Sequence, residues 1–287
     1  MPEMPEVQGL TTFLADRVVG RTITRTSVGA IAALKTYDPP NTALHGAEIT
    51  AATRRGKFVV LSAGDDLHLV FHLAKAGWLR WYELLPTTLI KPGKSPIALR
   101  VAFDDDSGFD LTEAGTKKSL AVYVVRDPDQ VPGIERLGPD PLDADFTREV
   151  FGDVLTGRRM QIKGLLRDQG VIAGIGNAYS DEILHAAKMS PYAIADKLTD
   201  DEVDRLYAAM QSTLTDAVAQ ASGKPPADLK DAKRRGMQVH ARRGETCPVC
   251  GDTVRSVFFA DRSLEYCPTC QTGGKILADR RLSRLLK

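Results

Sequence analysis

The spacing of apolar residues near the beginning of the chain predicts an amphipathic helix. From Val7 to Val18, apolar side chains recur at intervals of three or four residues, as they do along one face of a helix. Pro5 suits a first-turn position and Gly20 a termination, so the helix is expected to begin near Pro5 and to end before Gly20.

Apolar runs bounded by turn residues predict strands further along. Residues 58–61 and 67–73 are two such runs, and the turn-like residues 63–66 join them. Residues 120–125 form another run of the same kind. The chain up to about residue 130 is therefore expected to be rich in antiparallel sheet.

A break rich in glycine and proline at 137–142 separates this region from one with helical periodicity. Residues 145–221 contain several helical patterns, one around 179–188 and another over 200–221. The stretch 222–246 is polar and turn-rich, and it leads into a region that contains all the cysteines.

Composition restricts the class of protein. Of the 287 residues, 43% are hydrophobic and 26% are charged, which is ordinary for a globular protein and excludes disordered and collagen-like classes. No apolar run approaches the roughly 18 residues of a membrane span. The N-terminus has neither the basic flank nor the apolar stretch of a signal peptide, so we expect a cytoplasmic protein without a membrane partner.

Charge is distributed unevenly along the chain. The formal net charge is +1, but residues 224–287 hold 14 basic and 7 acidic residues, whereas the preceding residues hold 24 basic and 30 acidic ones. A basic C-terminal segment on an acidic chain suits a polyanionic partner, and a solvated charged tail is the alternative. Charge alone does not separate the two.

The four cysteines form one pattern, Cys247-Pro-Val-Cys250 and Cys267-Pro-Thr-Cys270, with 16 residues between the pairs. Two Cys-x-x-Cys pairs at this spacing supply the four thiolates of a tetrahedral zinc site. Two disulfides are the alternative, although they would be unusual in a cytoplasmic chain. The pattern predicts one structural zinc ion, and the apolar alternation between the pairs predicts a β-hairpin that turns near residues 260–262.

Five motifs, taken in order, resemble those of the formamidopyrimidine-DNA glycosylase and endonuclease VIII family. They are MPEMPEV at the start, RRGK at 54–57, LGPDPL at 137–142, IAGIGNAYSDEIL at 172–184, and the four-cysteine ending. Together they span almost the whole chain, which makes a chance match remote.

The resemblance implies an α+β multidomain protein that repairs DNA. It implies a β-sandwich flanked by helices (1–132), a linker (133–143), a helical domain with a helix-two-turn-helix element (144–235) and a β-hairpin zinc-finger domain (236–287). The implied partner is double-stranded DNA that carries damaged bases or abasic sites, bound by a monomer. The implied activity is bacterial-type base-excision repair, in which an oxidised base is removed and the abasic site is then cleaved by β,δ-elimination.

The resemblance also assigns catalytic roles to residues at the start of the chain. Removal of Met1 would expose the ring nitrogen of Pro2, a secondary amine that can attack the sugar C1′ and remain bonded as an iminium ion. Glu3 would protonate the sugar ring oxygen as the base leaves, and Glu6 would position Pro2 or a water molecule. Proline and glutamate at a helix start are also common capping residues, and the motif alone leaves that alternative open.

Three residues match the family's phosphate-binding positions. Lys57 follows a glycine at a strand start, Asn177 follows a glycine-rich turn, and Arg262 lies near the expected hairpin tip. The resemblance implies that they bind DNA phosphates while the damaged nucleotide is flipped out, and that Lys57 also serves catalysis. Taken singly, they also fit an exposed strand-end lysine, a helix cap and a solvated turn residue.

Two segments depart from the family pattern. HLAKAG at 72–77 places Lys75 where the family has a methionine, and LTEAGTKKS at 111–119 lacks the family's Arg-Phe motif. The side chains that fill the space left by a flipped nucleotide are therefore unassigned, and with them the preference for the opposing base.

The segment before the first cysteine is short beside that of purine-specific members. Its length slightly favours oxidised pyrimidines or abasic sites over oxidised purines such as formamidopyrimidines. A DNA-binding sensor or scaffold that has lost catalysis, and a zinc-stabilised scaffold without DNA, remain as alternatives to the enzyme.

Overall fold

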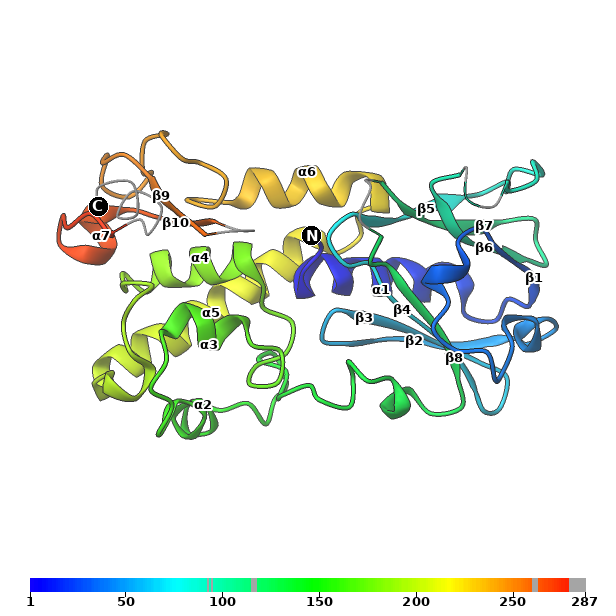
Figure 1. Ribbon diagram of the computed structural model, residues 1–287, viewed down its shortest axis with the longest axis horizontal. Coiled ribbons are helices and arrows are strands. Elements are labelled where there is room, and N and C mark those ends of the chain that lie inside the picture. Colours follow the sequence, from blue (N-terminus) through cyan, green and yellow to red (C-terminus); the bar gives the residue numbers. More distant parts are fainter. Residues whose placement is uncertain (92, 94, 115–117, 260–262, 279–287) are drawn as a thin grey trace. The chain divides into compact units, whose positions relative to one another are not determined.

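The computed structural model describes residues 1–91, 93, 95–114, 118–259 and 263–278, and the chain divides into two compact units (Figure 1). The first unit consists of Met1–Arg136 and Gln220–Ala232, and the second of Leu137–Ala219 and Lys233–Lys287. The α-helices of the described residues are α1 (Met4–Val18), α2 (Arg148–Leu155), α3 (Ile162–Arg167), α4 (Asn177–Ala186), α5 (Asp200–Ala221), α6 (Pro226–Gly236) and α7 (Pro268–Thr272). The strands are β1 (Ile23–Val28), β2 (Ile49–Arg55), β3 (Phe58–Ala63), β4 (Leu67–His72), β5 (Gly77–Tyr82), β6 (Ile97–Phe103), β7 (Gly108–Glu113), β8 (Ala121–Val125), β9 (Arg255–Phe258) and β10 (Ser263–Tyr266).

The strands of the first unit form a β-sandwich, as predicted. Within its described residues they pair antiparallel into two four-stranded sheets, in the orders β1-β6-β7-β5 and β2-β3-β4-β8. Apolar side chains from both sheets share one core. Phe71 of β4 and Phe109 of β7, for example, have ring centroids 6.1 Å apart. The alternation of inward and outward side chains along each strand makes this packing possible.

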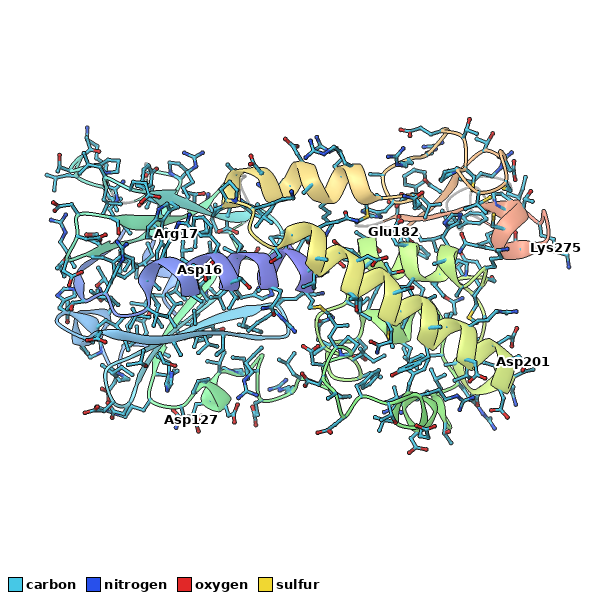
Figure 2. All side chains as sticks on the ribbon, turned by 180° about the vertical axis from the view of Figure 1, so that it is seen from behind. Asp16, Arg17, Asp127, Glu182, Asp201 and Lys275 are labelled. Carbon is cyan, nitrogen blue, oxygen red and sulfur yellow. The ribbon has the colours of Figure 1, made fainter. Side chains whose placement is uncertain are left out.

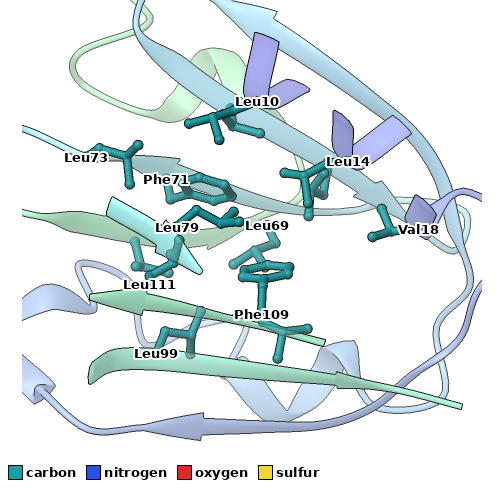
Figure 3. Packing of buried hydrophobic residues seen from close by; sticks show 14 of the residues in the cluster. Leu10, Leu14, Val18, Leu69, Phe71, Leu73, Leu79, Leu99, Phe109 and Leu111 are labelled. Atoms are coloured by element: carbon teal, nitrogen blue, oxygen red, sulfur yellow. The ribbon is translucent and has the colours of Figure 1, made fainter. Parts of the chain in front are cut away.

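Helix α1 packs into the same core. Leu10, Leu14 and Val18 are fully buried, and Figure 3 shows them directed toward the side chains of the sheets. The helix begins at Met4, one residue before the predicted start near Pro5. Asp16 and Arg17 lie on the same helix (Figure 2), where Asp16 is exposed.

The strands predicted from apolar runs are confirmed with small changes at their ends. The runs at 58–61 and 67–73 correspond to β3 and β4, which pair antiparallel, and the run at 120–125 corresponds to β8. Strand β4 ends one residue earlier than expected. The backbone leaves the extended region after Leu73, and Ala74 takes a positive φ of 51°.

The second unit contains the helical region and the zinc hairpin. Helix α5 coincides with the predicted 200–221. The helix predicted at 179–188 is shifted toward the N-terminus: α4 begins at Asn177 and ends at Ala186, because Lys188 adopts a left-handed φ of 50°. Strands β9 and β10 form the predicted antiparallel hairpin, whereas its predicted tip and Arg262 lie outside the described residues.

The interpretation of 222–246 as a polar, turn-rich stretch is wrong in part, because it contains α6. Pro226 lies at the first turn of this helix, and Leu229 and Ala232 are buried along one face. The indole Nε1 of Trp78 donates to the Pro226 carbonyl at 3.0 Å, and the Lys230 ammonium lies 4.3 Å from the centroid of the Trp78 ring system. The apolar positions of α6 are few and lie among many charged residues, so its amphipathic pattern was not recognised in the sequence.

Within the part of the chain that the structure describes, no helix combines the length and the apolar character needed to cross a membrane.

Candidate functional site

The chain begins with a buried, acidic helix start in the first unit. Pro2 is buried, and Glu3 and Glu6 are only 2% and 3% exposed. Glu3 is the N-cap of α1 and Glu6 the third residue of its first turn, and together they form a capping box in which the Glu3 N–H donates to Glu6 Oε2 at 2.8 Å. A carboxylate has several acceptor sites, so this capping role leaves room for a chemical one.

Lys57 lies in the tight turn between β2 and β3, and it is only 7% exposed. Gly56 takes a positive φ of 55° in this turn. Arg54 Nε donates to Gln8 Oε1 at 2.9 Å, and Arg54 Nη1 donates to the Gly56 carbonyl at 3.0 Å. Arg54 therefore fastens the turn that carries Lys57 to helix α1, on which Glu6 also lies.

His72, at the end of β4, is a neighbour of Lys57 to which the sequence analysis gave no role. Its ring centroid lies 4.7 Å from that of Phe58, its partner across the β3–β4 ladder. Burial, together with the positive charge of Lys57, lowers the pKa of His72 to about 4. The imidazole is thus neutral at pH 7. Lys57 directly precedes Phe58, so it is the pairing of Phe58 with His72 in the β3–β4 ladder that brings His72 near Lys57. The sequence alone does not show this pairing.

Asn177 begins helix α4 in the second unit. Its side-chain Nδ2 donates to the Ser263 carbonyl at 2.8 Å, which joins the start of α4 to the first residue of β10. The Asn177 carbonyl accepts a bond from Lys163 Nζ at 3.2 Å. Gly174, just before the helix, takes a positive φ of 89°, a conformation that suits glycine in a turn.

The four cysteines gather at one point of the second unit. Sγ of Cys247 lies 3.9 Å from Sγ of Cys270, and Sγ of Cys250 lies 3.3 Å from Sγ of Cys267. All four sulfur atoms lie within 4.8 Å of one another, and the cysteines are free thiols. A tetrahedral ion with 2.3 Å bonds separates its sulfurs by about 3.8 Å, whereas a disulfide bond is about 2.05 Å long. The site therefore fits one structural zinc ion, and the disulfide alternative fails.

His185 of α4 also contacts this site, although it was not among the predicted site residues. It is 4% exposed, and its Nε2 lies 3.3 Å from Cys247 Sγ. When Cys247 is a zinc-bound thiolate, an imidazole N–H at this distance can donate to the sulfur. A histidine 62 residues before its cysteine gives no local sequence signal.

Replacing His185 by phenylalanine is expected to accelerate zinc release. The ring volume is kept, but the donor to Cys247 is lost, and removal of such outer contacts weakens metal binding by about 10–100-fold. Transfer of zinc to a coloured chelator, followed by absorbance, measures the effect. His68→Phe, a change in the first unit, serves as the matched control. Equal release rates for both variants would contradict the prediction.

The predicted residues thus fall into two groups. Pro2, Glu3, Glu6 and Lys57 belong to the first unit, and Asn177 and the four cysteines belong to the second. Within each unit, side-chain contacts connect the elements that carry them. The roles in catalysis and DNA binding remain predictions.

Comparison with known proteins gives three family matches along the chain. Residues 1–121 match the formamidopyrimidine-DNA glycosylase N-terminal domain, and residues 137–225 match the H2TH domain of the same enzymes. Residues 244–273 match a zinc finger found in FPG and IleRS.

Relatives of known sequence or structure are similar over most of their length. A formamidopyrimidine-DNA glycosylase of Symbiobacterium thermophilum is 35% identical over 98% of this chain and 93% of its own. An uncharacterized formamidopyrimidine-DNA glycosylase-like protein of Mycobacterium tuberculosis is 60% identical over 53% of this chain and 94% of its own. The Lactococcus lactis Fpg, solved in complex with DNA containing an abasic site, superposes with a TM-score of 0.82 at 26% identity, covering 94% of this chain and 99% of that one.

Proposed function

The chain belongs to the formamidopyrimidine-DNA glycosylase family, and from that premise we propose that it is a bifunctional repair enzyme. In this proposal it removes an oxidised base from double-stranded DNA and then cleaves the abasic site by β,δ-elimination. The domain limits given above, 1–132, 144–235 and 236–287 with a linker at 133–143, are part of the same proposal.

The observation that carries the proposal is the burial of Pro2, Glu3 and Glu6 around the first turn of α1. Glutamate side chains are almost never fully buried unless they are paired, and here two lie beside the same proline. The positive end of the α1 dipole also favours a neutral amine over a protonated one at this position. While Met1 is present, the Pro2 nitrogen is part of a peptide bond, so the proposed nucleophile requires that Met1 be removed.

In the proposed reaction, the lone pair of the Pro2 nitrogen attacks the sugar C1′, and the base leaves with the electron pair of the glycosidic bond and with the proton that the Pro2 nitrogen loses. Glu3 gives a proton to the sugar ring oxygen as the ring opens, which yields an iminium ion between Pro2 and C1′. Loss of a proton from C2′ then expels the 3′ phosphate, and a second elimination expels the 5′ phosphate. Hydrolysis of the remaining iminium frees Pro2.

Lys57, Asn177 and Arg262 are proposed to bind the phosphates beside the lesion. Buried Lys57 is held to α1 through Arg54, so it is suited to a fixed phosphate close to the reacting sugar. Asn177 keeps one amide proton for a ligand, since its other engages Ser263. Zinc, when bound by the four cysteines, stabilises the hairpin next to Arg262 and takes no part in the reaction.

For the substrate, we propose oxidised pyrimidines or abasic sites ahead of oxidised purines. The support is the short segment before Cys247, much of which is folded into α6 and anchored through Pro226 to Trp78. A segment fixed in this way has few residues left to close over a large flipped base.

The alternative is a damage sensor without catalysis, and Lys75 favours it. This residue is exposed in the turn after β4, in a position where the family has an apolar side chain. A charged tip replaces lost base stacking poorly. The sensor would bind abasic-site DNA without covalent chemistry.

Borohydride trapping separates the two functions. Processed protein is incubated with duplex DNA that carries an abasic site, and borohydride reduces any iminium to a permanent crosslink that is seen on a denaturing gel. The enzyme is expected to give a crosslinked species, whereas stable binding without a crosslink would overturn the lyase assignment. A panel of duplexes with different oxidised bases then identifies the substrate from the release of each base.

A further inference from the structure

A cluster of four titratable side chains, three of them buried, lies in the second unit, apart from the predicted catalytic residues. Its members come from different elements: Lys163 from α3, Asp181 from α4, His240 from the segment before the first cysteine, and Glu265 from β10. Lys163, Asp181 and Glu265 are only 6%, 1% and 6% exposed. A charged group that is buried to this extent is costly unless it is paired with an opposite charge or hydrogen-bonded.

The contacts form a chain across the cluster. Lys163 Nζ donates to Asp181 Oδ1 at 2.5 Å and to Ser180 Oγ at 2.9 Å. The other carboxylate oxygen, Asp181 Oδ2, lies 2.8 Å from His240 Nδ1. The same His240 nitrogen lies 3.0 Å from Glu265 Oε2. One imidazole nitrogen therefore stands between two carboxylates from different elements.

The backbone of His240 is also fixed, by the residue next to Asp181. The carboxylate of Glu182, labelled in Figure 2, accepts the N–H groups of Gln238, Val239 and His240 at 2.7, 3.0 and 2.8 Å. These three bonds attach the segment before the zinc site to α4, and they place the His240 ring against Asp181. The charged groups around His240 are thus the carboxylates of Asp181, Glu182 and Glu265. Lys163 contacts Asp181 on the carboxylate oxygen that does not face His240.

Charge balance gives the state of the ring. Asp181 and Glu265 bring two negative charges, and Lys163 offsets one of them. A neutral His240 would leave Glu265 without a positive partner, whereas an imidazolium offsets its charge. The buried carboxylate of Glu182 is satisfied separately, by its three backbone N–H donors. Burial would lower the pKa of His240, but hydrogen bonds to Asp181 and Glu265 and their charges raise it to about 9.

We propose that His240 is a positioning residue, an imidazolium that bridges Asp181 and Glu265 and so holds the zinc hairpin against the start of α4. The hydrogen bond from Asn177 to the Ser263 carbonyl also joins α4 to the hairpin, and Ser263 lies two residues before Glu265 on β10. The bridge therefore sets the spacing between Asn177 and the hairpin. Its consequence for DNA binding rests on the proposed function.

A divalent cation between His240, Asp181 and Glu265 is the competing interpretation, since one ligand atom from each lies within 4.8 Å of the others. A tetrahedral ion with ligand bonds of about 2.1 Å would hold its ligand atoms about 3.4 Å apart. His240 Nδ1 instead lies 2.8 and 3.0 Å from the two carboxylate oxygens, the distances of direct contacts. We therefore expect one metal ion per chain, at the cysteines.

The first test measures the protonation state of the His240 ring. The zinc-loaded chain, labelled with ¹⁵N-histidine, is examined by NMR at pH 7.5, and His240→Gln identifies the His240 signals. Chemical shifts of an imidazolium are expected. A neutral ring, or a second bound metal ion per chain that is lost in His240→Gln, would overturn the proposal. Neither readout depends on DNA, so a failure of the proposed function is distinguishable from a failure of the bridge.

The second test uses charge compensation. His240→Gln is expected to lower the thermal midpoint of the zinc-loaded chain by several degrees, and to raise its Kd for a duplex with a stable abasic-site analogue about tenfold. Adding Glu265→Gln removes the unbalanced charge. The double variant is expected to recover most of the midpoint and to bind within about threefold of the native Kd.

A loss in the double variant that equals or exceeds that of His240→Gln would overturn the proposal, because a contact that is only steric gains nothing from the second change. Arg242→Gln is the matched control for stability. It breaks a 3.0 Å ion pair with Glu245 in the same segment, where both side chains are partly exposed. Because this ion pair is accessible to solvent, Arg242→Gln is expected to lower the thermal midpoint much less than His240→Gln does.

Discussion

Protein that retains Met1, or whose N-terminal nitrogen is acetylated after Met1 removal, is expected to give no borohydride-trapped complex with abasic-site DNA. In both forms the Pro2 nitrogen is an amide, and its lone pair is delocalised into the carbonyl group. It cannot form an iminium ion. We expect a loss on the order of 10³-fold or more relative to protein that begins at Pro2, as is typical when a nucleophile is removed. Mass spectrometry of each preparation establishes the state of the N-terminus.

Glu3→Gln is the companion variant for this experiment. Glutamine can keep a polar oxygen at the N-cap, so α1 is expected to remain intact, but it cannot supply the proton for ring opening. Release of a damaged base should fall by about 10²–10⁴-fold, while trapping on a preformed abasic site continues. Trapping that persists after complete acetylation would place the nucleophile elsewhere, and the role of Pro2 would then be wrong.

The features that sequence predicted well are those whose signal is local. Cys247 and Cys250 form one short motif, and the spacing to the second pair is that of a hairpin, so the zinc site followed from chemistry alone. Helix α5 was predicted because its pattern persists over 22 residues. The runs that became β3 and β4 are apolar enough to stand out from their turns.

The features that sequence did not predict depend on contacts between distant segments. Lys163 and Asp181 are 18 residues apart, and His240 reaches Asp181 across 59 residues. Each of these residues alone looks like an ordinary surface charge. The same holds for His72, whose pKa is lowered by burial and by the positive charge of Lys57.

The end of α4 and the existence of α6 were also not predicted, for a different reason. The end of α4 depends on the backbone conformation of Lys188, which is unusual for a lysine and gives no sign in the sequence. In α6 the apolar face is narrow, with Leu229 and Ala232 buried among charged neighbours. Proline and glycine near the start of that segment favoured a turn, and burial against the first unit outweighed them.

Removal of zinc is expected to abolish DNA binding while the β-sandwich stays folded. The apolar cluster around the site is small, consisting of Val239, Cys247, Val254 and Cys267 with Cys270 against it. The second apolar cluster of the hairpin, formed by Val257, Leu264 and Tyr266, is equally small. We therefore expect the hairpin to depend on the metal, whose binding in small fingers contributes about 10–16 kcal/mol. The sandwich has its own extensive core, to which the zinc cluster does not belong.

The experiment compares the Kd for abasic-analogue DNA before and after treatment with a chelator, with metal loss verified by elemental analysis. We expect Kd to rise at least about 100-fold, because the hairpin and its contact with Asn177 are lost together. Re-addition of zinc should restore binding, which separates metal loss from irreversible damage. Unchanged affinity in verified metal-free protein would show that the hairpin keeps its position through the Asp181, His240 and Glu265 contacts alone. The His240→Gln variant, stripped of zinc in the same way, would then be the form that loses binding.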